Sequence, residues 1–146
     1  MKPSTIAKSI LGIGAGVLLG FLVWWVVPEY FKAREDPRSQ PHLSRIAAEL
    51  NRSVPFMIDK ETELMPAQGM DGIFIYNYRL VSFSASQIDP NRFATGAKQR
   101  VVQGACSTPE TRDDFLKKGV TLRYSYYDKD KKPIATVDVT PADCGF

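Results

Sequence analysis

Residues 73–83 read IFIYNYRLVSF, a run rich in aromatic and β-branched side chains. Such side chains favour β-strands, in which alternate residues point to the same face of the sheet. The apolar and aromatic residues at even positions share one face: Phe74, Tyr76, Tyr78 and Leu80. Asn77 and Arg79 fall on the opposite face, so the alternation predicts a half-buried strand.

Shorter strand signals lie on both sides of this run. Upstream, residues 56–58 and 62–65 are short apolar pieces around a charged turn. Downstream, residues 120–127 and 134–140 alternate apolar and polar side chains around a charged loop, which is the pattern of a β-hairpin. We therefore expect a small antiparallel sheet of about four strands.

Three segments carry helical signals. In residues 41–51, apolar side chains recur at the i, i+3, i+4 spacing of one helix face. Residues 90–105 carry apolar side chains at every fourth position: Phe93, Ala97, Val101 and Ala105. Residues 107–110 read STPE, the form of a capping box, and Gly119 is expected to end that helix. Helices packed on a small sheet predict an α+β domain, an arrangement that resembles the cystatin-like architecture.

Five tyrosines gather in two of the predicted strands. Four of them alternate along one strand face: Tyr76, Tyr78, Tyr124 and Tyr126. The simplest interpretation is a core under the helices. Because tyrosine keeps a polar tip, a recognition surface for a partner protein is the alternative. Tyr127 breaks the alternation and is the better candidate for exposure.

Residues 10–27 contain no charged side chain and read ILGIGAGVLLGFLVWWVV. At about 1.5 Å per residue, a helix over this run is just long enough to cross the hydrocarbon core of a bilayer. A cleaved signal peptide would end in small residues, whereas this run ends in Trp24, Trp25 and two valines. We expect an uncleaved membrane helix at 10–27, with a cytoplasmic tail at 1–9, a juxtamembrane linker at 28–41 and a periplasmic domain at 42–146.

The orientation and pairing of this helix follow from its flanks and its glycines. A basic tail placed directly before the apolar run has the layout of a signal anchor, although basic residues after the run oppose that direction. We expect the C-terminal domain to lie in the periplasm, outside the cytoplasmic membrane. Three glycines share one helix face, as in membrane helices that pair closely: Gly12, Gly16 and Gly20. A homodimer through this helix is one expectation, and common membrane-helix composition is the alternative.

The two cysteines, Cys106 and Cys144, are too far apart for a thioredoxin-type motif or a zinc knuckle. They flank the predicted capped helix and hairpin, so a disulfide bond would tie the chain end to the start of that helix. Two free buried thiols are the alternative. A catalytic thiol would need a nearby histidine, and His42 is the only histidine in the chain.

The sequence offers little catalytic chemistry. Asp59, Glu61 and Glu63 are grouped next to Lys60, which is most simply a solvated turn. The phosphate-binding glycine loop and the G-x-S-x-G motif are both missing from the domain. Basic and acidic residues are interspersed and nearly balanced after the apolar run, whereas nucleic-acid binding needs a concentrated basic face. We expect no metal, no cofactor and no nucleic-acid partner.

Several short stretches carry a resemblance to known proteins: VPFMIDKETEL at 54–64, CSTPETR at 106–112, YSY at 124–126 and ADC at 142–144. With them the chain resembles a group of small bacterial envelope proteins that have one N-terminal membrane span and a cysteine-bridged α+β domain. The resemblance implies an envelope location and supports a Cys106–Cys144 disulfide bond. It brings no catalytic residues to this chain.

These observations favour a membrane-tethered, non-enzymatic module that binds a partner protein or assists assembly in the bacterial envelope. Its expected partners are the lipid bilayer and one other protein. An inhibitor or immunity-type protein that blocks an enzyme or machine is the alternative, and a periplasmic hydrolase is the third hypothesis.

Overall fold

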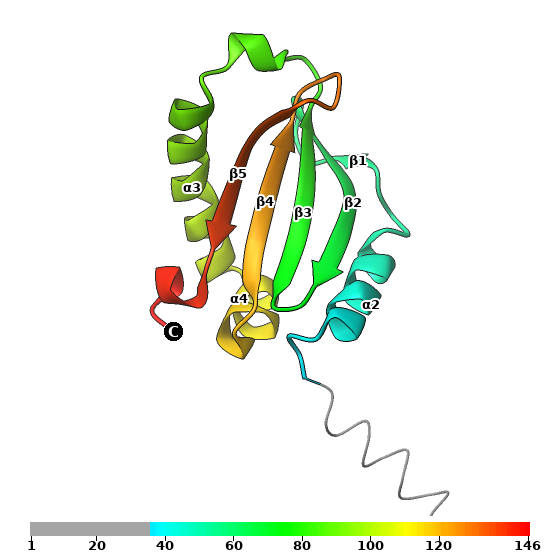
Figure 1. The fold of residues 1–146 in the computed structure, drawn as a ribbon, viewed down its shortest axis with the longest axis vertical. Helices are drawn as coiled ribbons and strands as arrows, with labels where there is room; N and C mark the ends of the chain where they lie inside the picture. Colours follow the sequence, from blue (N-terminus) through cyan, green and yellow to red (C-terminus); the bar gives the residue numbers. More distant parts are fainter. Residues whose placement is uncertain (1–35) are drawn as a thin grey trace, which may run out of the picture. The chain divides into compact units, whose positions relative to one another are not determined.

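Five strands form a single sheet in the order β1-β2-β3-β4-β5. The computed structural model describes residues 36–146 (Figure 1). Its strands are β1 (Phe56–Met57), β2 (Thr62–Met70), β3 (Ile73–Leu80), β4 (Thr121–Tyr127) and β5 (Pro133–Val139). Its α-helices are α2 (Gln40–Leu50), α3 (Pro90–Ser107) and α4 (Pro109–Asp114). The expected α+β class is confirmed, and the sheet has one strand more than we expected.

The sheet is mixed, which corrects the expectation of an antiparallel sheet. Strands β3 and β4 run parallel, with Phe74 opposite Leu122 and Tyr78 opposite Tyr126. The three other neighbouring pairs are antiparallel. The cause is α3, which connects β3 to β4 and returns the chain to the end of the sheet where β3 began. A parallel pair requires a crossover connection of this kind.

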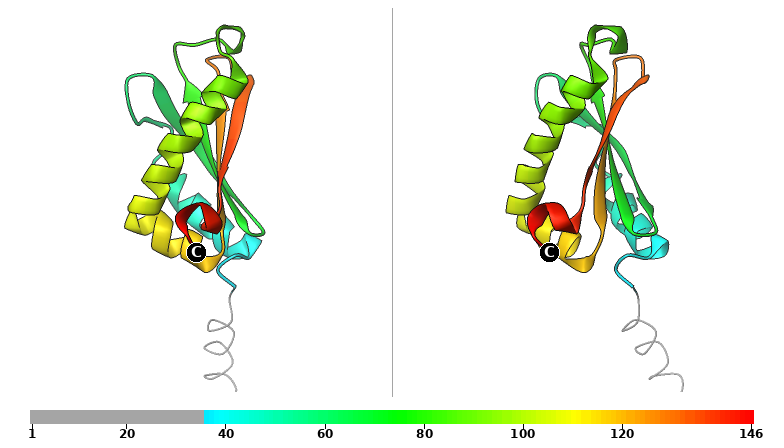
Figure 2. Two further views of the ribbon diagram at one scale, coloured as in Figure 1. Left: turned by 90° about the vertical axis from the view of Figure 1, so that its left-hand side faces the viewer. Right: turned by 60° about the vertical axis from the view of Figure 1, so that its left-hand side comes forward.

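Helices α2 and α3 both pack on the face that carries the tyrosines. Gly69 pairs with Phe74, so both point to this face, and a Cβ atom at Gly69 would lie only 2.3 Å from the backbone of Leu43 in α2. On the same face, the ring of Phe93 in α3 meets the ring of Tyr126 edge-on, with centroids 5.0 Å apart. Figure 1 looks onto the other face, where no helix crosses in front of β2–β5, and Figure 2 shows α3 standing off one side of the sheet.

The core lies between this face and the helices. Leu43 and Ala47 of α2 and Ala105 of α3 are buried against it. Most of the remaining buried apolar side chains come from the strands and from the segment before β4: Ala67, Phe74, Phe115, Leu116, Val120, Leu122, Tyr124, Val137 and Val139. The alternation seen in residues 73–83 therefore identified the face of β3 that packs under the helices, but the strand is not half-buried, because Ile75 and Asn77 on the opposite face are buried as well.

Two local expectations differ from the structure. The S-x-x-E pattern at 107–110 makes no capping box, because α3 runs through Ser107 and its hydroxyl donates to the carbonyl oxygens of Gln103 and Gly104. Thr108 is the N-cap of α4 and makes no side-chain cap. Strand β2 continues past 65 to Met70, across a register shift between Met65 and Gln68.

The side chain of Asn51 repairs that irregularity in β2. Its amide donates to the carbonyl oxygen of Ala67 at 2.9 Å and accepts from the amide of Ala67 at 2.7 Å. Pro66 has no N–H to offer the sheet, so the ladder between β2 and β3 is interrupted here. The end of α2 thus supplies the two hydrogen bonds that a neighbouring strand would otherwise make.

A disulfide bond joins Cys106, near the end of α3, to Cys144. Both cysteines of the chain are used in it, so neither is free. Lys98 of α3 adds an ion pair to Asp143 at 2.8 Å. These two links hold the C-terminal segment against α3.

The predicted membrane helix at 10–27 and its glycine face lie outside the described residues, as does the tail at 1–9. Among residues 36–146, no helix has the length and apolarity to cross a membrane. The chain divides by its contacts into residues 1–35 and residues 36–146. Within the second unit, residues 38–40 already touch the sheet, because the carbonyl of Arg38 accepts from the amide of Gly72.

Candidate functional site: a groove beside helix α3

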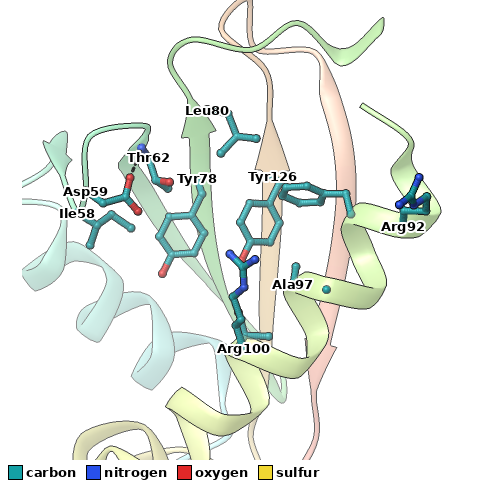
Figure 3. Close-up of a pocket in the computed structure, with 12 residues that line it drawn as sticks. Ile58, Asp59, Thr62, Tyr78, Leu80, Arg92, Ala97, Arg100 and Tyr126 are labelled. Carbon is teal, nitrogen blue, oxygen red and sulfur yellow. Dashed lines mark hydrogen bonds between the residues drawn. The ribbon is translucent and has the colours of Figure 1, made fainter. Parts of the chain in front are cut away.

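A groove of about 400 Å³ lies between α3 and the tyrosine face, at the end of the sheet where β3 stops (Figure 3). One wall is α3, the floor is β3 and β4, and the far rim is the turn between β1 and β2. Its lining residues are Ile58, Asp59, Thr62, Tyr78, Leu80, Arg92, Phe93, Gly96, Ala97, Arg100, Val101 and Tyr126. We name this feature the α3 groove.

The α3 wall follows from helical spacing. Asp89 caps the helix by accepting from the amides of Asn91 and Arg92, and Pro90 begins it. One row of α3 side chains that lines the groove belongs to the predicted apolar series: Phe93, Ala97 and Val101. The neighbouring stripe is polar and open, with Arg92, Gly96 and Arg100 at four-residue intervals. A Cβ atom at Gly96 would meet nothing within 4 Å, so this glycine leaves a notch between the two arginines.

The floor is made by stacked tyrosines. The rings of Tyr78 and Tyr126 lie 5.5 Å apart, and the rings of Tyr76 and Tyr124 lie 5.4 Å apart. Tyr124 is buried and belongs to the core, whereas Tyr78 and Tyr126 are half-buried and line the groove. The four predicted tyrosines therefore share one face. They form a core at one end of the stack and a groove floor at the other.

Burial makes these tyrosines harder to deprotonate. It raises the pKa of Tyr76 to about 12 and also raises the pKa values of Tyr78 and Tyr124. Burial raises the pKa of Tyr126 as well, and the nearby Arg100 guanidinium partly offsets that rise. At neutral pH the floor is therefore uncharged, and its hydroxyl groups can act as hydrogen-bond donors.

The charges in the groove are unequal. Among the described residues, Arg92 and Arg100 make neither an ion pair nor a side-chain hydrogen bond, and both are exposed. Asp59 is the one carboxylate in the lining. Its oxygen accepts from the amides of Glu61 and Thr62, and these bonds lower its pKa. The groove therefore contains two arginines without an acidic partner in the described domain, and its one carboxylate, Asp59, is already hydrogen-bonded to backbone amides of its own turn.

The sheet face opposite the groove has its charges paired. Arg79 donates to Glu63 at 2.8 Å, and Arg123 makes a two-bond pair with Asp138 at 2.8 Å for both bonds. Tyr127 lies on this opposite face, since it pairs with Arg79 across the parallel ladder. The structure thus separates Tyr127 from the four other tyrosines.

The carboxylates and the histidine singled out in the sequence do not converge. Asp59 belongs to the groove rim, Glu63 to the opposite face, and His42 to α2. Among residues 36–146 no three side chains of His, Cys, Asp or Glu are close enough together to hold a metal ion.

Sequence reasoning missed two groups of residues. One is the pair Arg92 and Arg100, which are eight residues apart and lie beside the apolar stripe on α3. The spacing can be seen in the sequence, but it does not show that the two side chains line a groove. The other is Asp128, assigned only to a hairpin tip. It is 1% exposed and accepts from the backbone amides of Ala85, Asp130 and Lys132.

Large apolar side chains are exposed at the same end of the sheet as the groove. Phe56, Met57 and Ile58 of β1 and its turn are 41%, 47% and 51% exposed, and Phe83 follows β3 with 41% exposed. Contiguous exposed apolar side chains beside a concave surface are typical of sites that bind another molecule. The α3 groove and this apolar rim together are the candidate binding site.

Comparison with known proteins identifies similar folds. No protein-family model matches the sequence, and no curated protein sequence matches it either. A solved structure of a putative secreted protein from Pseudomonas aeruginosa superposes with a TM-score of 0.58 at 18% identity, covering 72% of this chain and 95% of that one.

Two solved pilotins share the fold to a similar degree. The pilotin EpsS of the Vibrio vulnificus type 2 secretion system has a TM-score of 0.59 at 18% identity, and the alignment covers 73% of this chain and 92% of EpsS. The type II secretion system pilotin AspS of Vibrio cholerae has a TM-score of 0.53 at 16% identity, covering 72% of this chain and 94% of AspS. At these identities the similarity shows a common α+β fold.

Proposed function

We propose that this protein is a non-enzymatic assembly module of the bacterial envelope, which binds a segment of a partner protein in the α3 groove. The observation that carries the proposal is the groove itself: an open aromatic slot with an exposed apolar rim and two uncompensated arginines. A site of this composition suits the docking of a side chain or peptide, since aromatic side chains and arginine dominate protein-binding surfaces.

The chemistry of the groove argues for binding over catalysis. General acid–base catalysis needs a titratable group that can exchange a proton near neutral pH. The tyrosines of the floor have raised pKa values, and the carboxylate of Asp59 is held in its charged form by two backbone amides. Two of the similar solved structures are pilotins of type 2 secretion systems, which supports a role in envelope assembly.

The binding proposal can be tested by photo-crosslinking in cells. A photoreactive phenylalanine analogue is placed at Ile58, on the groove rim, and at Met70, which is equally exposed at the other end of the sheet. We expect one discrete crosslinked product from position 58 and none from position 70. Gly96→Leu fills the notch in the groove and should abolish the product, whereas Gly104→Leu, also facing open space on α3, should leave it unchanged. Equal products at both positions, or a product that survives Gly96→Leu, would exclude the groove as the site.

We also propose that residues 10–27 anchor the protein in the cytoplasmic membrane, with the domain in the periplasm. The uncharged run and the basic tail before it support this arrangement. Alkaline phosphatase is active only after export, so a fusion after Phe146 should be active. An inactive fusion would reverse the proposed orientation.

The glycine face of the proposed membrane helix supports pairing of two copies. Small residues at four-residue spacing allow close contact between helix backbones in lipid. In a membrane association reporter, Gly16→Ile should abolish self-association of residues 1–35. Gly14→Ile adds the same volume on another face and should preserve it. Equal signals from the two variants would contradict a pairing role for this face.

A further inference from the structure

We infer that the segment bound in the α3 groove is acidic, with two carboxylates about 12 Å apart on either side of a large apolar side chain. This inference rests on the proposed function and specifies the partner of that same site. It follows from how α3 presents its two arginines, from what lies between them, and from where the groove sits in the domain.

The spacing of the cations sets the spacing of the carboxylates. Arg92 and Arg100 are eight residues apart on α3, which corresponds to about 12 Å along a helix axis. Both line the groove, and neither has an acidic partner among residues 36–146. Other arginines of the domain are paired with carboxylates at short distance, including Arg52, Arg79, Arg112 and Arg123. The groove pair therefore has hydrogen-bonding capacity that a bound carboxylate would satisfy.

The space between the arginines suits an apolar side chain. Gly96 leaves the α3 wall open at the midpoint, and the floor opposite it carries the rings of Tyr78 and Tyr126. Figure 3 shows Arg100 reaching toward the hydroxyl end of Tyr126, with Tyr78 beside it. A large apolar side chain placed on these rings would bury aromatic surface, while carboxylates on either side would meet the two guanidinium groups.

The apolar surface around the groove favours a protein segment over a lipid headgroup. Arg38 and Gly72 touch at the end of the sheet where β3 starts, and the groove lies at the end where β3 stops. Tyr78 is the first groove residue of β3 and lies five residues after Ile73, so roughly 17 Å of strand separates the groove from the end of the sheet where the chain enters the domain. The exposed residues 56–58 also extend the apolar surface beyond a headgroup-sized pocket.

The test uses the full chain in nanodiscs of neutral phosphatidylcholine and a phage-displayed library of random peptides as the probe. We expect the selected peptides to be enriched in Asp and Glu around a Phe, Leu or Trp. Arg92→Gln combined with Arg100→Gln should weaken binding of the selected phage about tenfold, the size expected for two partly exposed charge pairs. Arg52→Gln makes the same change at an exposed residue in the turn after α2 and should leave binding within about twofold.

Each other outcome is decisive. Selected peptides that are lost with Gly96→Leu but are not acidic, or that ignore the arginine substitutions, would overturn the acidic partner while the groove keeps its proposed function. Peptides that survive Gly96→Leu would overturn both proposals. Binding of phosphatidylglycerol vesicles that depends on Arg92 and Arg100, without any selected peptide, would replace the peptide with a lipid headgroup and overturn this inference.

Discussion

Replacing Gly69 with alanine should destabilise the domain more than any other single methyl addition at its described glycines. Gly69 lies in β2 directly beneath α2, and an added Cβ atom would lie 2.3 Å from the carbonyl carbon of Leu43 and 2.4 Å from the amide nitrogen of Ser44. Ordinary carbon contacts are about 3.5–4.0 Å, so α2 would have to retreat by about 1 Å. The obstacle is backbone, and a side-chain rotation cannot relieve it.

The loss of stability can be estimated from the packing that α2 loses when it moves away from the sheet. Leu43 and Ala47 are 1% and 4% exposed, and both would lose part of their packing against the sheet. Overpacking of this kind costs about 3 kcal/mol when the structure must shift to absorb it. For a domain of this size, that loss lowers the melting temperature by roughly 12 °C.

The assay is urea unfolding of residues 36–146 followed by far-UV circular dichroism, since both tryptophans of the chain precede this fragment. Gly104→Ala is the matched control: it adds the same methyl group where nothing lies within 4 Å, and should stabilise α3 by about 0.5–1 kcal/mol. A Gly69→Ala variant whose free energy of unfolding falls by less than about 1 kcal/mol would refute the close approach of α2 to β2.

Three further predictions concern stability. Replacing Cys106 and Cys144 together with serine should lower the free energy of unfolding by roughly 4 kcal/mol, and a variant as stable as the oxidised wild type would contradict this. Asp128→Asn should cost about 2 kcal/mol at pH 7, because the new NH₂ group faces the amide of Ala85. Backbone hydrogen bonds, first that from Ala85, lower the pKa of Asp128 below the unfolded value of 3.8. The stabilisation by the Asp128 carboxylate is therefore present above pH 3.8 and is lost as the pH falls through the lowered pKa of the folded protein. A stability difference between Asp128→Asn and wild type that stays the same in acid would contradict this. Asn51→Ala should cost about 2–4 kcal/mol, since two buried backbone groups lose their partner, and an effect below about 1 kcal/mol would mean that water replaces the side chain.

Strand and helix positions were largely readable from local patterns. The period of two in residues 73–80 identified the face of β3 that packs under the helices, and the four-residue spacing from Phe93 to Ala105 identified the side of α3 that packs on the sheet. The helix predicted at 41–51 is α2 within one residue at each end. These patterns are local because they record which side of one element faces the core.

The direction in which neighbouring strands pair could not be predicted from such local patterns. The alternation in β3 and β4 is the same whether the two strands run parallel or antiparallel, so the direction depended on where α3 returned the chain. The extension of β2 past residue 65 to Met70 was not predicted, and Pro66 stands within it. The side chains of Asn51, at the end of α2, and Asn77, on β3, bond the backbone of the interrupted ladder.

Local patterns in the sequence were enough to predict the α+β class, the tyrosine face and a bond between the two cysteines, because each of these depends on residue type and short-range spacing. The tertiary structure decided which tyrosines are core and which line a groove, since α3 covers one end of the stack closely and leaves space at Gly96 at the other. It also decided that Arg92 and Arg100 lack acidic partners in the described domain while other arginines have them. The depth of burial and the open space of the groove arise between elements that are distant in the chain, and for that reason no local pattern contains them.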